Sequence, residues 1–129
     1  EIGAAGDVDT AAVMLQTASG KICQISNSRR ATYGYDQRIE VHGEKGMLRA
    51  DNMLESSVEV ATASGFRRAP AQHFFLERYA DAYRLEMVHF IDAVKAGVQP
   101  SPNIEDGLKA QILADAAARA LETGQPQHV

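Results

Sequence analysis

The polar segment 27–38 (N-S-R-R-A-T-Y-G-Y-D-Q-R) contains the residues best suited to bind a small molecule. Tyr33 and Tyr35 flank Gly34, and Asp36 follows directly. Tyrosine hydroxyls and a carboxylate supply directional hydrogen-bond groups, and the tyrosine rings supply flat apolar faces. A polyhydroxylated ligand needs both kinds of contact. The segment is also compatible with a solvated loop whose tyrosines pack on a sheet edge, which is the commoner case for such a composition.

Motifs for a cofactor or a nucleophile are missing from the sequence. Its ten glycines nowhere form G-x-G-x-x-G after a strand, nor a phosphate loop that ends in Gly-Lys-Ser/Thr. No strand–helix–strand crossover is predicted that could hold a dinucleotide. No G-x-S-x-G motif supports a serine nucleophile. We therefore expect no cofactor site on this chain.

The histidines and the single cysteine do not suggest a metal site. His42, His73, His89 and His128 are scattered, and no two of them have the spacing of zinc ligands. We expect His42 on the polar face of a strand, His73 in the connection before a helix, and His89 in solvent. Cys23 has no second cysteine with which to form a disulfide, and its position predicts a small buried strand residue.

Composition limits the class of protein. The chain has 129 residues, of which 45% are hydrophobic and 23% charged, and a formal net charge of −4. These values describe one ordinary globular domain and oppose disorder. No apolar run approaches the ~20 residues that span a bilayer, and the acidic balance opposes nucleic-acid binding. The chain begins at Glu1 without a methionine or a targeting segment, so we expect a processed terminus or a piece of a longer protein.

Short alternating runs separated by glycine turns predict five or six mostly antiparallel strands before Pro70. Thr17–Gly20 and Gly43–Gly46 have the composition of hairpin turns. The predicted strands are Asp9–Thr17, Lys21–Ser28, Gln37–Gly43, Met47–Ala50, Ser57–Thr62 and Phe66–Ala69.

A helical period begins at Phe74. Apolar residues recur every three or four positions from there, which predicts one long amphipathic helix that ends at Gly97. The residues at its start, 74–79, are expected in the core, with Glu77 and Arg78 on the outside.

A second helix is predicted to run to about Glu122, capped by Ser101 or by Asn103. Strands followed by helices indicate an α+β fold. We expect a mostly antiparallel open sheet of five to six strands, with two long helices packed on one face.

The first two predicted strands are apolar on both faces. Val13 and Leu15 lie on one face of the first strand, and Ala12 and Met14 on the other. Two helices cover only one face of a sheet, whereas strands that are apolar on both sides need cover on both. We therefore expect a second cover, supplied either by another subunit or by a part of the protein that this chain does not contain.

Several motifs together resemble a known family. The chain resembles the C-terminal domain of the Gfo/Idh/MocA oxidoreductases along essentially its whole length, and Y-G-Y-D-Q-R narrows the resemblance to the inositol 2-dehydrogenase branch. The motifs that show it are Ile25–Arg30, Y-G-Y-D-Q-R at 33–38, E-V-H-G-E-K-G-M at 40–47, Arg78–Tyr83 and Asp106–Gly107.

That resemblance implies a larger protein. In this family an N-terminal Rossmann domain binds NAD or NADP, and the C-terminal domain completes the substrate pocket and forms a homo-oligomer through its open sheet face. The implied reaction is hydride transfer from C2 of myo-inositol to NAD⁺, which gives scyllo-inosose. The expected partners are a polyol or sugar substrate and further copies of the protein, with no nucleic acid and no membrane, in the cytoplasm.

The resemblance also implies particular site residues. It assigns Tyr35 to the substrate pocket, with Tyr33 and Asp36 as weaker neighbours. The family's catalytic lysine, in a Glu-Lys-Pro motif, and its Asp-x-x-x-His pair have no counterpart here. We therefore expect no catalytic, cofactor-binding or metal-binding residue on this chain, NAD on the missing domain, and an inactive isolated fragment.

Two alternatives remain open. The first is a dehydrogenase of the same family that acts on another sugar or polyol. The second is a non-catalytic binding or assembly module with this fold.

Overall fold

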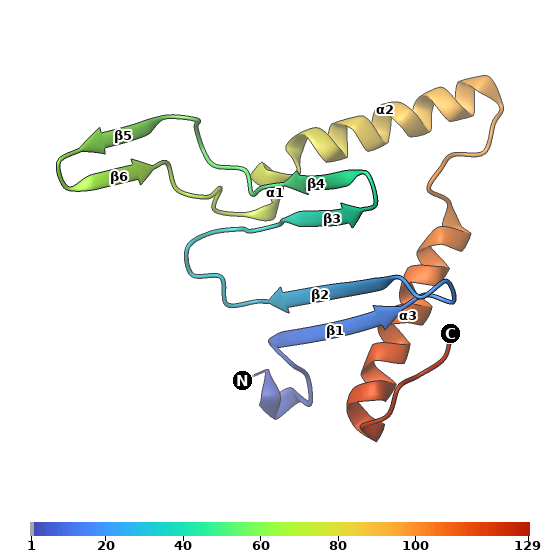
Figure 1. Cartoon of the computed structure of the whole chain (residues 1–129). Coiled ribbons are helices and arrows are strands. Elements are labelled where there is room, and N and C mark those ends of the chain that lie inside the picture. The colour runs from blue at the N-terminus through green and yellow to red at the C-terminus, as the bar shows by residue number, and fades with distance from the viewer. Residues whose placement is uncertain (1) are drawn as a thin grey trace. The chain divides into compact units, whose positions relative to one another are not determined.

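The computed structural model describes residues 2–129 (Figure 1). Glu1, which prompted the expectation of a processed or incomplete chain, lies outside these residues. Contacts divide the chain into two units, one of residues up to 11 with 26–83, the other of residues 12–25 with 84–129. A short 3-10 helix, η1 (Gly3–Ala5), precedes the first strand.

The first two strands, β1 (Thr10–Gln16) and β2 (Ile22–Ser28), pair with each other. In β1 the residues Ala11, Val13 and Leu15 are half-buried while the residues between them are exposed, so the predicted face of Val13 and Leu15 is confirmed. Every residue of β2 is exposed. The expectation that Cys23 is buried is therefore wrong, because both faces of its strand stay exposed among the described residues.

The first unit contains two further hairpins. In β3 (Ile39–Gly43) and β4 (Gly46–Ala50), Ile39 lies opposite Ala50, which confirms the hairpin predicted across 43–46. The second hairpin consists of β5 (Glu59–Thr62) and β6 (Gly65–Arg68). The connections on either side of it meet, since Leu54 forms an antiparallel bridge with Ala71.

The α+β class and the antiparallel strand pairs are confirmed, but one continuous sheet is not. Within residues 2–129 the six strands form three separate two-stranded sheets. Alternation of apolar and polar residues shows where a strand lies, but it does not show which strand edge finds a partner. Polar connections at 29–38 and 51–58 separate the three pairs in the chain. Large apolar residues on β3–β6 stay exposed, namely Ile39, Val41, Met47, Leu48, Val60 and Phe66.

The helix predicted from Phe74 is divided in two. α1 (Phe75–Arg78) ends at Tyr79, and α2 (Ala80–Ala96) follows. The Glu77 carboxylate accepts hydrogen bonds from the backbone N–H groups of His73 (3.1 Å) and Phe74 (3.4 Å), so it caps the start of α1. His73 precedes the helix, as predicted.

The expected core at 74–79 is not formed within the chain. Phe74 and Leu76 are exposed, whereas Arg78, which was expected on the outside, is half-buried. Tyr79 interrupts the helical period at this point, so the positions before and after it do not share one face. Gly97 ends α2 with a positive φ of 66°, as its sequence position predicts.

The last helix, α3 (Ile104–Thr123), begins at Asn103 and not at Ser101. The Asn103 Oδ1 atom accepts hydrogen bonds from the N–H groups of Glu105 (3.0 Å) and Asp106 (3.2 Å). In return, Asp106 Oδ2 accepts from the Asn103 N–H at 3.1 Å. This reciprocal capping box satisfies the free N–H groups of the first helical turn, which explains the choice of cap.

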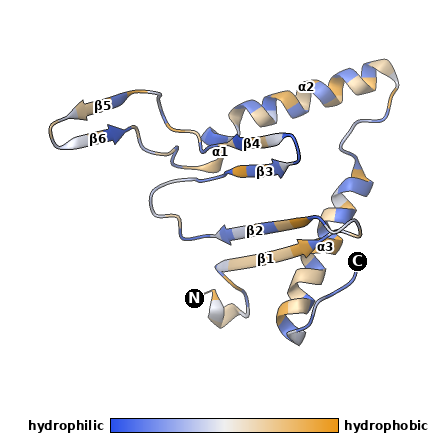
Figure 2. Cartoon of the chain, in the orientation of Figure 1, coloured by the Kyte–Doolittle hydropathy of each residue, from blue (hydrophilic) through white to orange (hydrophobic). Residues whose placement is uncertain are grey.

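Very little of the chain is buried. Ala93 in α2 and Ala116 in α3 are the only buried residues among 2–129. Both long helices show apolar and polar residues interleaved along their length (Figure 2). Across the same described residues, no helix is both long enough and apolar enough to cross a membrane.

We predict that Asn103→Ala lowers the free energy of unfolding by about 1 kcal/mol, because two N–H groups of α3 lose their acceptor. The measurement is urea unfolding of the protein that contains this chain, followed by circular dichroism. Asn103→Asp is the control, because its carboxylate keeps the acceptor. Equal stability of the two variants would contradict this account of the α3 cap.

Candidate functional site

The loop between β2 and β3 holds Tyr35 by its backbone on both sides. The Tyr35 N–H donates to the carbonyl oxygen of Gln72 at 2.7 Å. The Tyr35 carbonyl accepts from Asn52 Nδ2 at 3.0 Å. The residue itself is half-buried. Both backbone groups of Tyr35 are thus fixed by segments that lie 17 or more positions away in the sequence.

Gly34 makes this arrangement possible. Its φ is +123°, and a Cβ atom added there would lie 2.9 Å from the Gln72 carbonyl oxygen and 3.0 Å from the Ala71 Cβ. Real Cβ atoms do not approach backbone oxygen that closely, and side chains other than hydrogen disfavour this φ. The glycine between the two tyrosines therefore lets the loop lie directly against residues 71–72.

The ring of Tyr35 packs edge-on against Tyr79, which joins α1 to α2. Their ring centroids are 5.4 Å apart with an interplanar angle of 79°. Tyr79 makes a similar contact with Tyr83 at 6.3 Å. A hydrogen bond with Tyr35 is the main cause that raises the pKa of Tyr79, and burial raises it further. The Tyr79 phenol therefore stays protonated at neutral pH and remains a hydrogen-bond donor.

Tyr79 and Tyr83 were missed as site residues by reasoning from the sequence. Their spacing fits the apolar stripe of a helix, which is the interpretation that the period favours. Their side-chain chemistry could have indicated them, because Tyr79 and Tyr83 carry hydroxyl groups at positions where a purely apolar stripe needs none. The structure brings Tyr79 to Tyr35, which yields neighbouring hydroxyls beside aromatic edges.

The Asp36 carboxylate is bound within its own loop. The Tyr33 hydroxyl donates to Oδ2 at 2.8 Å, and Arg38 donates through Nε to Oδ1 at 2.9 Å and through Nη2 to Oδ2 at 2.8 Å. The hydrogen bond from Arg38 is the largest cause that lowers the pKa of Asp36, and the bond from Tyr33 adds to it against the opposing effect of burial. Asp36 thus serves first to shape the loop.

The three residues predicted for the substrate pocket are close in sequence but differ in setting. Tyr35 contacts Tyr79 from another segment, whereas Tyr33 contacts Asp36 and is 62% exposed. Hydrogen bonding to the Asp36 carboxylate, together with its charge, raises the pKa of Tyr33. In the structure Tyr35 therefore packs against Tyr79, whereas Tyr33 stays at the surface.

Two polar atoms next to this cluster have unused hydrogen-bonding capacity. Gln72 Oε1 and Arg78 Nε are buried and have no hydrogen-bond partner within the described residues. The Arg78 guanidinium also lies over the ring of Tyr79, 5.5 Å from its centroid. Buried polar atoms in native proteins almost always have partners. These two atoms lie on the residues that contact Tyr35 and Tyr79.

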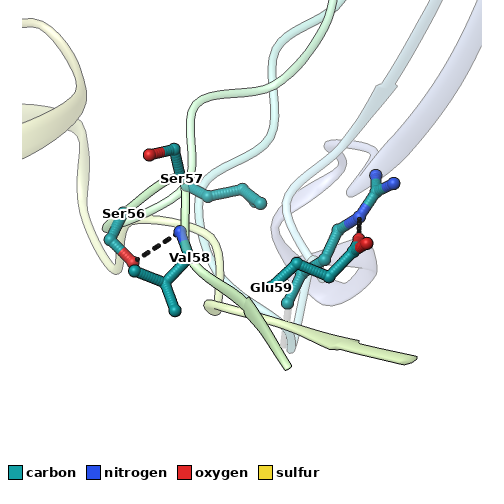
Figure 3. A pocket seen from close by; sticks show the side chains of 6 residues that line it. Ser56, Ser57, Val58 and Glu59 are labelled. Atoms are coloured by element: carbon teal, nitrogen blue, oxygen red, sulfur yellow. Dashed lines mark hydrogen bonds and ion pairs between the residues drawn. The ribbon is translucent and has the colours of Figure 1, made fainter. Parts of the chain in front are cut away.

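An open pocket of about 330 Å³ lies at the base of the β5–β6 hairpin (Figure 3). Three of its polar side chains are engaged locally: Arg68 Nε is paired with Glu59 Oε2 at 2.6 Å, and Ser56 Oγ accepts from the Val58 N–H at 3.3 Å. No histidine or cysteine is among its lining residues, which are Leu54, Ser56, Ser57, Val58, Glu59 and Arg68. The pocket offers no arrangement for acid–base or nucleophilic chemistry.

The remaining candidate groups make local contacts. His42 Nε2 lies 2.8 Å from Glu40 Oε1 on exposed β3, as expected for the polar face of that strand. His89 Nε2 accepts from the Ser101 N–H at 3.4 Å. Across residues 2–129, no three His, Cys, Asp or Glu side chains are placed to hold a metal ion.

The chain's described residues do not fit a nicotinamide cofactor. A dinucleotide site in an α/β fold needs a parallel β–α–β unit with a glycine-rich turn at a helix start. The strand pairs of residues 2–129 are hairpins, and the glycine fingerprint is missing from the sequence.

We predict that Gly34→Ala destabilises the protein by more than Gly65→Ala. Gly65 has a similar φ of +113° but open space around it, so its replacement costs only about 1 kcal/mol of backbone strain. At Gly34 the added methyl group also meets backbone oxygen, which adds roughly 1–3 kcal/mol. Urea unfolding measures both variants, and equal losses would show that the close approach to residues 71–72 is unimportant.

We also predict that the stabilisation provided by Asp36 depends on pH. Because the folded-state pKa of Asp36 is lowered, its contribution is present above the ordinary Asp pKa and is lost as the pH falls through the folded value. Wild type should therefore be more stable than Asp36→Asn at neutral pH, and the gap should close below about pH 4. Asp115→Asn is the control, since its exposed carboxylate accepts one hydrogen bond from Gln111. A difference in the free energy of unfolding between wild type and Asp36→Asn that does not change with pH would contradict the proposed role of the Asp36 carboxylate.

Comparison with known proteins identifies relatives of the whole chain. Residues 2–129 match the model of an oxidoreductase family, specifically its C-terminal alpha/beta domain. Inositol 2-dehydrogenase from Rhizobium meliloti is 55% identical over 120 residues, which are 93% of this chain and 36% of the relative. Myo-inositol 2-dehydrogenase from Thermotoga maritima is 52% identical over 122 residues, again 36% of its length.

Solved structures agree with these relatives. The structure of a putative myo-inositol dehydrogenase from Sinorhizobium meliloti matches 95% of this chain and 37% of its own, at 53% identity with a TM-score of 0.91. Scyllo-inositol dehydrogenase from Lactobacillus casei, solved with bound NAD(H) and scyllo-inositol, matches 95% of this chain and 36% of its own, at 29% identity with a TM-score of 0.85.

This chain spans little more than a third of the length of the relatives it matches. Its match to the family model, in contrast, extends over nearly every residue. The chain belongs to the Gfo/Idh/MocA oxidoreductase family and corresponds to its C-terminal α/β domain.

Proposed function

We propose that this chain is the substrate-pocket domain of an NAD-dependent inositol 2-dehydrogenase. In the proposed reaction the C2 carbon of myo-inositol gives a hydride to NAD⁺ and its hydroxyl group gives up a proton, so the products are an inosose, NADH and H⁺. The observation that supports it most is the high identity to two inositol 2-dehydrogenases, 55% and 52%, across nearly the whole chain.

The Tyr35 cluster fits a polyol chemically. Inositol presents hydroxyl groups around its rim and C–H groups on its faces, so it needs donors and acceptors next to an apolar surface. Tyr35 and Tyr79 offer two hydroxyl groups beside ring edges at a centroid distance of 5.4 Å. Tyr35 is proposed to bind substrate directly. Tyr33 and Asp36 are proposed as weaker contacts, since they are already bonded to each other at 2.8 Å.

The cofactor, the general base and most of the pocket are proposed to lie in the part of the protein outside this chain. The isolated chain is then inactive and binds no NAD. Relatives that are about three times as long support this division. Tight binding of NADH to the isolated chain in a fluorescence titration would overturn it.

The exposed strand faces are proposed to be covered in a cytoplasmic homo-oligomer. One face of the β3–β4 pair presents large apolar residues to solvent, among them the opposed Val41 (53% exposed) and Leu48 (76% exposed). A protein that leaves such surfaces uncovered aggregates, so a second copy or the rest of the chain must cover them. Light scattering of the complete protein tests this proposal, and a monomer would contradict it.

A second candidate is a dehydrogenase for a different inositol isomer. One relative, from Halalkalibacterium halodurans, is an inositol 2-dehydrogenase/D-chiro-inositol 3-dehydrogenase, and the Lactobacillus casei structure contains scyllo-inositol. These names show that related proteins differ in the isomer or carbon on which they act. The substrate panel below separates the two candidates.

The test is a steady-state assay of the complete protein that contains this chain. Reduction of NAD⁺ and of NADP⁺ is measured with myo-, scyllo- and D-chiro-inositol and with simple sugars. The highest kcat/KM is expected for myo-inositol with NAD⁺. A preference for another polyol would support the second candidate, and no activity on any of them would favour a non-catalytic binding or assembly module.

We predict that Tyr35→Phe raises the KM for myo-inositol roughly 3- to 10-fold, the usual effect of losing one neutral hydrogen bond. Tyr33→Phe is the matched comparison, because it also removes one phenol hydroxyl. Its effect is expected to be smaller, since Tyr33 donates its only hydroxyl hydrogen to Asp36 and is 62% exposed, whereas Tyr35 is half-buried against Tyr79. A larger effect at Tyr33 than at Tyr35 would reverse the proposed roles.

A further inference from the structure

Asn52 lies just beyond the end of a β-hairpin, at the point where the Tyr35 loop leaves it. In the β3–β4 pair, Ile39 lies opposite Ala50. The same register, continued by two residues, places Gln37 opposite Asn52. Regular backbone pairing has ended there, since β3 begins at Ile39 and β4 ends at Ala50.

The side-chain amide of Asn52 continues the pairing that the backbone has stopped. Its Oδ1 atom accepts from the Gln37 N–H at 3.2 Å, as a carbonyl oxygen of the strand would. Its Nδ2 atom donates to the Tyr35 carbonyl at 3.0 Å, as a strand N–H would. Because an amide has both a donor and an acceptor, it can act like a peptide group in this position.

Tyr35 has two backbone anchors, and Asn52 supplies one of them. The other is the bond from the Tyr35 N–H to the Gln72 carbonyl at 2.7 Å. Asn52 is half-buried, so its bond to the Tyr35 carbonyl is partly shielded from competing water, while its bond from Gln37 is exposed. Without the Asn52 side chain, only the bond from the Tyr35 N–H to the Gln72 carbonyl holds this backbone. The Tyr35–Asp36 peptide can then rotate, and the Tyr35 ring shifts against Tyr79.

We propose that Asn52 is a positioning residue for the substrate pocket, which fixes the Tyr35 hydroxyl by bonding the loop on both sides of Asp36. It does not contact substrate itself. This inference rests on the proposed function only in its kinetic consequence, because the two hydrogen bonds exist whatever the substrate is. Its structural consequence can therefore be tested separately.

The kinetic test uses Asn52→Ala and Asn52→Asp in the complete protein. The Ala variant loses both bonds, and the Asp variant keeps an acceptor for Gln37 but turns a carboxylate oxygen toward the Tyr35 carbonyl. Both variants are expected to raise the KM for the preferred polyol roughly 5-fold or more, while kcat changes less than about 2-fold. The KM for NAD⁺ should not change.

Asn103→Ala is the matched control for general destabilisation. The Asn103 side chain likewise makes two hydrogen bonds to the backbone, both as acceptor, but it belongs to the other structural unit, at the start of α3. It should lower stability to a similar extent and leave the polyol KM unchanged. A KM increase in this control equal to that of Asn52→Ala would reduce the role of Asn52 to general stability and overturn the proposal.

The structural test is hydrogen exchange, which requires no substrate. In Asn52→Ala, exchange of the loop peptide that contains Tyr35 and Gln37 should be clearly faster, whereas exchange in α3 should not change. Unchanged exchange of the loop would overturn the positioning role even if the enzyme were active. Faster exchange in a protein that oxidises no polyol would instead support the anchor and reject the proposed function.

Discussion

The close contact of residues 34–35 with residues 71–72 is the constraint on which the first unit depends. Gly34 approaches the Gln72 carbonyl so closely that no Cβ fits, and the neighbouring N–H of Tyr35 bonds to the same oxygen. Asn52 holds the other side of Tyr35. Gly34 thus allows the Tyr35 loop to lie against residues 71–72, which precede α1, while Asn52 beyond the end of β4 holds its other side. The aromatic contact between Tyr35 and Tyr79 follows from that arrangement.

The chain shows how a domain can have complete local structure without a complete core. Hairpin registers, helix caps and the loop network are all formed by residues of the chain itself. Yet only Ala93 and Ala116 are buried among residues 2–129. Two-stranded sheets are marginal without further packing. Residues 2–129 therefore leave large apolar surfaces exposed, and the relatives they match are nearly three times as long.

Much of the local structure was predictable because short-range physics decides it. Turn glycines, strand alternation and the Gly97 helix end are each fixed by neighbours in the sequence. Burial was not predictable in the same way. Cys23 is exposed and Arg78 half-buried, the reverse of what their residue types suggest. An expectation of burial drawn from a hydrophobic pattern assumes a complete core, and residues 2–129 do not form one.

The sequence by itself determined the α+β class, the presence of five to six strands, the family and the loop that contains Tyr33, Tyr35 and Asp36. These features depend on residues that are close together in the sequence, so the sequence alone is enough to identify them. Only the tertiary structure decided that Tyr35 meets Tyr79, that Asp36 is bonded within its loop, and that Asn52 and Gln72 hold the loop from two sides. Apart from the bonds of Asp36, those contacts join segments 17 to 44 positions apart, and no local pattern specifies which distant groups meet.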